Sequence, residues 1–267
     1  MRQTEKCNYH THTSRCMHAE GEDEAYVQSA IRGGFDVLGF SDHAPFPFAS
    51  GYVSPIRMPM DEFPGYLASC QALKARYHGQ IRLHIGLEAE YFPDYADHLR
   101  RLFDQGVEYL ILGQHYLGSE EYSPYAGSDK LGDEGVLRYG EAVVQGIRSG
   151  LFAYVAHPDL TMRMRREDQF NAACMEAADM ICQAAAEAEI PLEYNLLGLA
   201  LQISGNGCGY PSRAFWDYVK RWNPRVILGV DAHRPSLLES GYLWMRGVDT
   251  LQRMGFERVE SLPLASD

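Results

Sequence analysis

The sequence has no apolar run that approaches the roughly 20 residues needed to cross a membrane as a helix. Its first residues, MRQTEKCNYHTHT, lack the apolar centre of a secretory signal peptide. The six cysteines form no C-x-x-C pair and no compact framework, which fits reduced thiols. We therefore expect neither a membrane partner nor secretion, and predict a cytoplasmic protein.

Positive charge is also scarce, because 24 Lys and Arg stand against 36 Asp and Glu, for a net charge of -12. Such a balance repels nucleic-acid backbones and anionic membrane surfaces, so a nucleic-acid partner is not expected. Any phosphate-bearing ligand must then be held by local positive charge, which bound divalent metal ions could supply. The sequence leaves the oligomeric state open.

Phosphate-binding glycine motifs are missing as well. Neither G-x-G-x-x-G nor G-x-x-x-x-G-K-S/T follows any apolar run, which removes the main support for a nucleotide-binding fold. We find no internal repeat, linker or low-complexity segment, and 46% of the 267 residues are hydrophobic. These features predict one ordinary globular domain that spans residues 1–267.

Short apolar runs alternate with longer segments of helical spacing. The predicted strands are Lys6 to His10, Val37 to Ser41, Ile81 to Leu87, Tyr109 to Gly113, Ala153 to Ala156, Leu192 to Tyr194 and Val226 to Val230. The predicted helices are Glu22 to Arg32, Asp61 to Tyr77, Tyr95 to Asp104, Glu134 to Ser149, Glu167 to Glu187, Ser212 to Arg221 and Leu237 to Met254. This alternation predicts an α/β protein with a parallel sheet, either closed into a barrel or doubly wound.

Residues able to bind metal follow six of the seven predicted strands. They are His10 and His12, Asp42 and His43, Glu88, His115, His157, and Asp231 and His233. In a parallel barrel the carboxyl ends of the strands open onto one mouth, so residues far apart in the chain become neighbours there. Imidazoles and carboxylates without thiolates favour Zn, Mn or Fe.

Each piece taken alone has a simpler interpretation. An H-x-H pair often arises by chance, Asp42 could cap a turn, and Glu88 could be an Arg-paired surface carboxylate. His115 and His157 could be core histidines. Three other histidines are not expected to bind metal: His78 lies at a helix C-terminus, where a dipole contact explains it, His98 lies on a polar helix face, and His84 lies within a strand and is interpreted as structural. Coincidence at six strand ends is much harder to sustain.

Together these segments resemble the polymerase-and-histidinol-phosphatase (PHP) superfamily. The motifs are HTHT from His10, SDH from Ser41, GLEAEY from Gly86, GQHY from Gly113, AHPD from Ala156 and GVDAH from Gly229, in the family's order. Within the superfamily the chain is most similar to the stand-alone histidinol-phosphate phosphatases. The resemblance implies a distorted seven-stranded (β/α)7 barrel of PHP type.

The resemblance also implies three divalent metal ions. One would be held by His10, His12, Glu88 and Asp231, and Glu88 would bridge to a second held by His115 and His157. A third would be held by His18, His43 and His233, where the inclusion of His18 rests on the family alone. The implied reaction is in-line attack on phosphorus by a hydroxide that bridges two metals, so Glu88, Asp231 and His233 are candidate catalytic residues. Asp42 either protonates the leaving oxygen or orients His43.

Substrate binding is where the sequence departs from the family. Members commonly carry a basic residue soon after the Asn that ends strand six, but Asn195 is followed by LLGLA. Arg163 and Arg165, just beyond His157, and Arg234, next to His233, are candidates to bind phosphate in its place, and Asn195 itself is a candidate substrate contact. The aromatic-rich segment Pro45 to Pro64 is a candidate lid.

The predicted activity is therefore hydrolysis of a small phosphomonoester, with L-histidinol phosphate as the leading substrate and histidine biosynthesis as the pathway. One alternative is a related phosphoesterase that acts on another small monoester or on nucleotides. Another is a metal-binding module without catalysis, for which the loss of ligand positions would be the mark.

Overall fold

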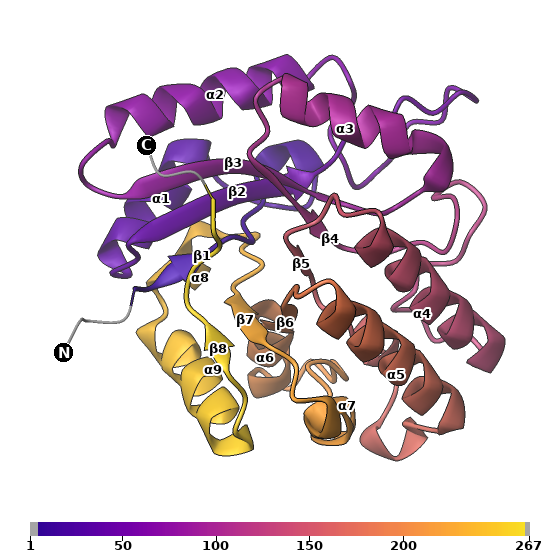
Figure 1. The fold of residues 1–267 in the computed structure, drawn as a ribbon. Helices are drawn as coiled ribbons and strands as arrows, with labels where there is room; N and C mark the ends of the chain where they lie inside the picture. Colours follow the sequence, from indigo (N-terminus) through magenta and orange to yellow (C-terminus); the bar gives the residue numbers. More distant parts are fainter. Residues whose placement is uncertain (1–4, 265–267) are drawn as a thin grey trace.

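The computed structural model describes residues 5–264, so residues 1–4 and 265–267 of the predicted domain lie outside the described residues. Its strands form one parallel sheet in the order β1 to β8. The strands are β1 (Cys7–Asn8), β2 (Val37–His43), β3 (Arg82–Ala89), β4 (Tyr109–Leu112), β5 (Tyr154–Val155), β6 (Leu192–Asn195), β7 (Val226–Gly229) and β8 (Arg258–Val259). The sheet is curled, so that one half of it lies opposite the other half (Figure 1).

The prediction of seven strands was wrong by one, since eight lie among the described residues. The additional strand β8 is only two residues long and is flanked by Glu257 and Glu260, so no apolar pattern marks it. It pairs with the beginning of β7. At the other end of β7 the chain meets β1, through a parallel bridge between Thr11 and Ala232. This single bridge links the two halves of the curled sheet at the carboxyl ends of the strands.

Helices surround the sheet on its outer side (Figure 1). Those in residues 5–264 are α1 (Asp23–Arg32), α2 (Phe63–Arg76), α3 (Ala96–Asp104), α4 (Asp133–Arg148), α5 (Ala172–Glu187), α6 (Leu196–Ile203), α7 (Arg213–Val219), α8 (Pro235–Glu239) and α9 (Gly241–Met254). Side chains cap several of them, as when the oxygen of Asn171 accepts a hydrogen bond from the backbone N–H of Cys174 at the start of α5.

Three differences from the predicted helices have local causes. The predicted helix from Glu167 is divided by the Asn171 cap into a 3-10 turn and α5. The predicted last helix is divided at Ser240, which caps α9. Helix α6 was not predicted, because LLGLALQI follows β6 without a break and its apolar residues conceal the boundary.

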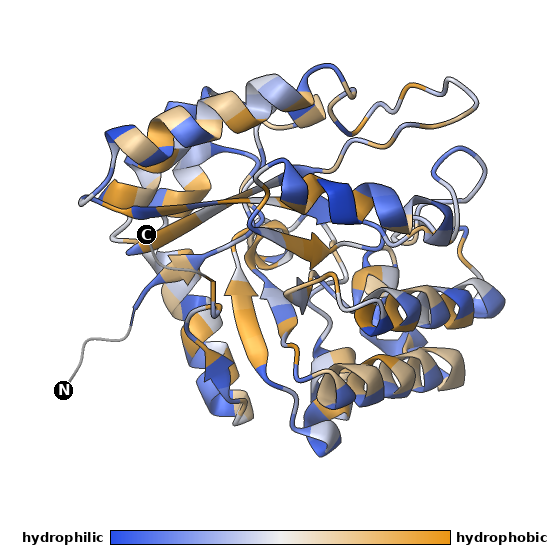
Figure 2. Cartoon of the chain, turned by 45° about the horizontal axis from the view of Figure 1, so that its top comes forward, coloured by the Kyte–Doolittle hydropathy of each residue, from blue (hydrophilic) through white to orange (hydrophobic). Residues whose placement is uncertain are grey.

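Aromatic and aliphatic side chains fill the interior of the curled sheet below the mouth. Tyr9, Tyr109 and Tyr154 belong to a buried cluster there, and Gly39 and Gly86 leave the room that the ring of Tyr109 occupies. The hydroxyl of Tyr109 lies 2.9 Å from the carbonyl oxygens of Tyr9 and Phe40, which links the start of β4 to β2 and to the residue after β1. Figure 2 shows hydrophobic strands inside helices that carry hydrophilic residues. Within the described chain, no helix has the length and apolarity to span a bilayer.

Candidate metal centre

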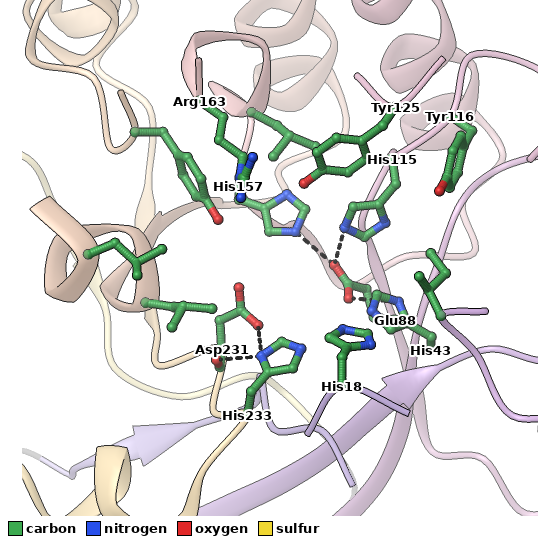
Figure 3. Close-up of a pocket in the computed structure, with 15 residues that line it drawn as sticks. His18, His43, Glu88, His115, Tyr116, Tyr125, His157, Arg163, Asp231 and His233 are labelled. Carbon is green, nitrogen blue, oxygen red and sulfur yellow. Dashed lines mark hydrogen bonds and ion pairs between the residues drawn. The ribbon is translucent and has the colours of Figure 1, made fainter. Parts of the chain in front are cut away.

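The carboxyl ends of the strands bring the predicted ligands to one cavity of about 400 Å³. Figure 3 shows the side chains of His18, His43, Glu88, His115, His157, Asp231 and His233 around it. His10 and His12 follow β1 and lie fully buried beneath them. All nine predicted ligand residues are therefore in this region, contributed by strands that are far apart in the chain.

Glu88 lies at the centre of the group. Its Oε1 is 2.8 Å from Nε2 of His157 and 3.6 Å from Nε2 of His115. Its Oε2 is 3.2 Å from Nδ1 of His43 and 3.4 Å from Nε2 of His12. Each carboxylate oxygen therefore faces a different set of imidazoles, which is the arrangement that a carboxylate bridging two metals requires. Gly113 permits it, because a Cβ there would lie 2.0 Å from Oε1 of Glu88.

Asp231 makes a second point of convergence. Its Oδ1 lies 3.2 Å from Nε2 of His12, 3.2 Å from Nδ1 of His233 and 3.5 Å from Nε2 of His10. Asp231 and His157 have φ angles of 52° and 60°, in the left-handed region that is unfavourable for their side chains. Strained backbone of this kind is retained where the surrounding structure holds a functional side chain in place.

His18 belongs to the same group although it lies on a loop. Its ring stacks on His233 with centroids 4.7 Å apart and lies 5.4 Å from the ring of His43. Its Nδ1 is 2.6 Å from the carbonyl oxygen of Cys16 and donates to it, which leaves Nε2 free to bind an ion. The buried thiol of Cys16 lies near the ligand atoms of His18 and His233, a neighbour that the sequence did not predict.

Several buried ligand atoms have no hydrogen-bond partner among the described residues. They are Nε2 of His10, Nε2 of His12, Nδ1 of His43, Nε2 of His233 and Oδ1 of Asp231. Leaving such atoms unsatisfied is costly, and bound metal ions remove the cost. The ligand atoms of His12, His43 and His233, and those of His10, His12 and Asp231, each lie within 4.8 Å of one another. The residues present therefore fit divalent metal ions.

Neighbouring charges favour the ionised form of the carboxylates, which is the form that binds metal ions. Burial alone would raise the pKa of Glu88, but His115, His10 and His43 hold it well below its usual range. Burial holds the pKa of His43 well below normal, so its ring is neutral. His10 differs: burial would lower its pKa, but Glu193 and Asp231 raise it well above the usual value. Metal must displace a proton there.

Two acidic residues that were not predicted from the sequence contact the Nδ1 atoms of two predicted metal ligands. Oε2 of Glu193 is 2.7 Å from Nδ1 of His10, and Oε1 of Glu90 is 3.1 Å from Nδ1 of His115. Both acids are fully buried. A charged residue within a strand that otherwise reads as buried was the available signal for Glu193, since such residues need a partner. For Glu90 the signal was its position two residues after Glu88, on the same side of an extended chain.

Asp42 is fully buried and does not line the cavity. It accepts hydrogen bonds from the hydroxyl and backbone N–H of Thr13 and from the backbone N–H of His43. Its Oδ1 also lies 3.5 Å from Nδ1 of His12. The ring that it faces is thus His12, whereas the sequence suggested His43.

The four predicted substrate residues are placed differently. Arg163 lines the cavity, with its guanidinium 5.8 Å from the centre of the Tyr125 ring (Figure 3). Arg165 instead donates to the carbonyl oxygen of Leu131, and Arg234 is exposed and pairs with Glu20. Asn195 is buried, and its amide donates to Glu193 and Asp231. The structure therefore brings only Arg163 of these four to the lining of the cavity.

The segment 45–64 forms part of the cavity wall through Ile56. Phe46 and Met58 are buried in the core. His84, interpreted as structural, pairs with Glu108 at 2.6 Å. The expectation of a polar helix face for His98 was wrong, because its ring is buried with Nε2 2.8 Å from the carbonyl oxygen of Pro45. Both contacts lie outside the metal site.

Comparisons with known proteins identify the family of the chain. A model of the PHP domain matches residues 8–196. A "Probable histidinol-phosphatase" of Deinococcus radiodurans is 30% identical over 259 residues, which cover 93% of this chain and 94% of that protein. The histidinol-phosphatase of Bacillus subtilis is 22% identical, with 90% and 97% covered. A solved histidinol phosphate phosphatase from Lactococcus lactis, complexed with zinc, L-histidinol and phosphate, has a TM-score of 0.72 at 20% identity, with 98% and 99% covered.

Proposed function

Since the chain belongs to the PHP domain family, we propose that it is a metal-dependent phosphomonoesterase which hydrolyses L-histidinol phosphate to L-histidinol and phosphate. The observation that carries this proposal is the convergence of nine metal-binding side chains on one cavity. Every ligand position that the family implies is filled, which argues against a module without catalysis. The activity would serve histidine biosynthesis.

We assign three divalent ions to the centre. His10, His12, Glu88 and Asp231 would hold the first, Glu88, His115 and His157 the second, and His18, His43 and His233 the third. The distances around the two oxygens of Glu88 support its role as the bridge. When bound, the ions would supply an activated hydroxide and neutralise charge on the phosphoryl group.

The residues of the cavity then bind and orient the ester. Arg163 is the candidate to hold phosphate oxygens, because a guanidinium can make two parallel charge-assisted hydrogen bonds. Asp42 would orient His12 rather than protonate the leaving oxygen, since it is buried behind that ring. Asn195 would steady Asp231 through its amide.

One feature of the cavity supports a second candidate class of substrate. Leu197 and Leu201 of α6 line the wall that follows Asn195, where related proteins commonly carry a basic residue. An apolar wall offers no charge to a second phosphate oxygen. A phosphomonoester other than L-histidinol phosphate is therefore the alternative to test.

Phosphate release from L-histidinol phosphate by the metal-loaded protein, beside a panel of nucleoside and sugar monophosphates, tests the proposal. We expect L-histidinol phosphate to exceed the others by orders of magnitude in kcat/KM. Preference for another monoester would replace the substrate and leave the metal chemistry. No turnover of any phosphate ester by protein with bound metal would overturn the phosphatase itself.

A further inference from the structure

A buried arginine lies beside the metal centre without facing the cavity. The side chain of Arg57, on the segment between β2 and α2, is only 1% exposed. Removing a guanidinium from water costs several kcal/mol unless it is paired and hydrogen-bonded. A residue buried at this cost within the wall of a functional site needs an explanation.

All three branches of the Arg57 guanidinium have partners. Its Nε donates to Oε2 of Glu120 at 2.7 Å, its Nη2 to Oε1 of Glu90 at 3.0 Å, and its Nη1 to the carbonyl oxygen of Ala44 at 3.0 Å. The side chains of Glu90 and Glu120 are at most 1% exposed. The guanidinium therefore joins the segment after β2, the end of β3 and the loop after β4.

Only one of the two glutamates also contacts a metal ligand. Oε1 of Glu90 is 3.1 Å from Nδ1 of His115, and since a carboxylate can only accept, that nitrogen carries the proton. The other nitrogen, Nε2, then has its lone pair free, and it faces Oε1 of Glu88 at 3.6 Å. Glu120 instead accepts from the hydroxyls of Ser54 and Tyr52.

We propose that Glu90 is a positioning residue for His115, and that Arg57 holds Glu90 in place while anchoring the cavity wall. Ile56, the neighbour of Arg57, lines the cavity, so one guanidinium fixes both a metal ligand and a surface that the substrate contacts. This inference rests on the proposed metal centre but not on which phosphomonoester is hydrolysed. It predicts that metal affinity and substrate affinity can be changed separately at Glu90 and Glu120, the two glutamates that Arg57 joins.

The two glutamates provide a matched pair of variants. Glu90→Gln and Glu120→Gln each remove one buried charge from the same guanidinium and keep the size of the side chain. Zn²⁺ affinity, measured against a competing chelator, should fall about 10- to 100-fold in Glu90→Gln, as when a carboxylate behind a metal-bound histidine is lost. Glu120→Gln should keep nearly the wild-type Zn²⁺ affinity and raise KM, because it loosens Ser54 and Tyr52.

If Glu90→Gln does not fold, a second variant and a spectroscopic signal still test the proposal. Arg57→Lys keeps the charge but cannot reach Glu90 and Glu120 together, so it should weaken Zn²⁺ binding and raise KM at once. In the zinc-loaded wild-type protein, the Nδ1 proton of His115 should give a downfield imidazole resonance. Absence of that resonance would contradict the hydrogen bond with Glu90.

The outcomes separate this inference from the proposed function. Equal Zn²⁺ affinity in Glu90→Gln and wild type, or equal losses in Glu90→Gln and Glu120→Gln, would overturn the positioning role and leave the phosphatase intact. Failure of the wild-type protein to bind any of Zn²⁺, Mn²⁺ and Fe²⁺ would overturn both. A loss of affinity confined to Glu90→Gln and Arg57→Lys supports the proposal.

Discussion

The mouth and the floor of the curled sheet are built from the same strands and have opposite chemistry. On β3, Gly86 leaves room for the ring of Tyr109 at the floor, and Glu88, two residues later on the same face, lies at the centre of the metal site. At the floor, the Tyr109 hydroxyl lies within hydrogen-bonding distance of backbone carbonyl oxygens. At the mouth, buried ligand atoms such as Nε2 of His10 and Oδ1 of Asp231 have no hydrogen-bond partner among residues 5–264.

The floor should therefore contribute mainly to stability, and the mouth mainly to metal binding and activity. The floor is packed mainly from apolar and aromatic side chains, so its stability should depend little on bound metal, although the buried hydroxyl of Tyr154 there has no hydrogen-bond partner among residues 5–264. The mouth concentrates unpartnered atoms and left-handed backbone at His157 and Asp231, which is costly without ions. Variants at the mouth should therefore change activity and metal binding more than folding, and variants at the floor the reverse.

The largest effect is expected from Glu88→Gln, because Glu88 faces five imidazoles through its two oxygens. We expect kcat/KM to fall at least about 10³-fold, the scale seen when a group that stabilises transition-state charge is lost. Steady-state phosphate release measures this, with circular dichroism as the control for folding. Metal-dependent activity within tenfold of wild type would contradict the role of Glu88 as the bridge.

A smaller loss is expected from Arg163→Ala. Its guanidinium lines the cavity, so we expect kcat/KM for the phosphomonoester to fall about 10²-fold as charge-assisted hydrogen bonds to phosphate are lost. Arg165→Ala and Arg234→Ala remove arginines that the structure places away from this lining, and should cost less. Equal losses in the three variants would show that phosphate is not bound where we propose.

Acid should weaken metal binding at the mouth and stabilise the metal-free protein there. The pKa of His10 is raised well above its usual value, since Glu193 and Asp231 outweigh the effect of burial. In metal-free protein, protonated His10 thus adds stability that is complete below pH about 6.5 and is lost as pH rises through the raised pKa. Metal binding should show the opposite trend and weaken as pH falls, because protons compete for the ring. Zn²⁺ titrations and Tm measurements from pH 6 to 9 check both signs, and pH-independent Zn²⁺ affinity would contradict them.

Glu193→Gln tests whether the Glu193 carboxylate orients the ring of His10. Removing the carboxylate that lies 2.7 Å from Nδ1 of His10 should lower metal affinity about 10- to 100-fold. It should also bring the pKa of His10 down, because its main electrostatic partner is lost. Chelator competition measures the first effect and histidine titration by NMR the second. An unchanged Zn²⁺ affinity would show that Glu193 only fills space.

The smallest effect on activity is expected at the floor, from Tyr109→Phe. This variant leaves the carbonyl oxygens of Tyr9 and Phe40 without the Tyr109 hydroxyl and should cost about 1–3 kcal/mol of stability. kcat/KM should stay near wild type once the protein is folded. Urea unfolding beside phosphate release checks this, and a loss of activity as large as that of Arg163→Ala would break the contrast between mouth and floor.

Much of the mouth could be predicted from sequence because each ligand follows an apolar run directly. His43, Glu88 and His157 were marked by their position at strand ends, and parallel strands bring their ends together. The inclusion of His18 came only from family resemblance, since no strand leads into it.

Other features of the fold and the site could not be predicted, because local sequence patterns do not reveal them. The contact between His10 and Glu193 joins residues 183 positions apart, so nothing near either residue identifies the other. Strand β8 is two residues long and charged on both sides, and helix α6 continues an apolar strand without a turn. Among the predicted arginines, Arg163 and Arg165 are two positions apart, and only their local backbone decides which one reaches the cavity.

Anomalous X-ray diffraction from crystals of the metal-loaded protein would locate the ions directly. We expect metal peaks at the mouth, with one pair of neighbouring peaks on either side of the Glu88 carboxylate and ligands drawn from the nine residues between His10 and His233. Data collected at the zinc, iron and manganese edges would identify the ions. Metal peaks only outside this group, or active crystals without a peak near Glu88, would contradict this expectation.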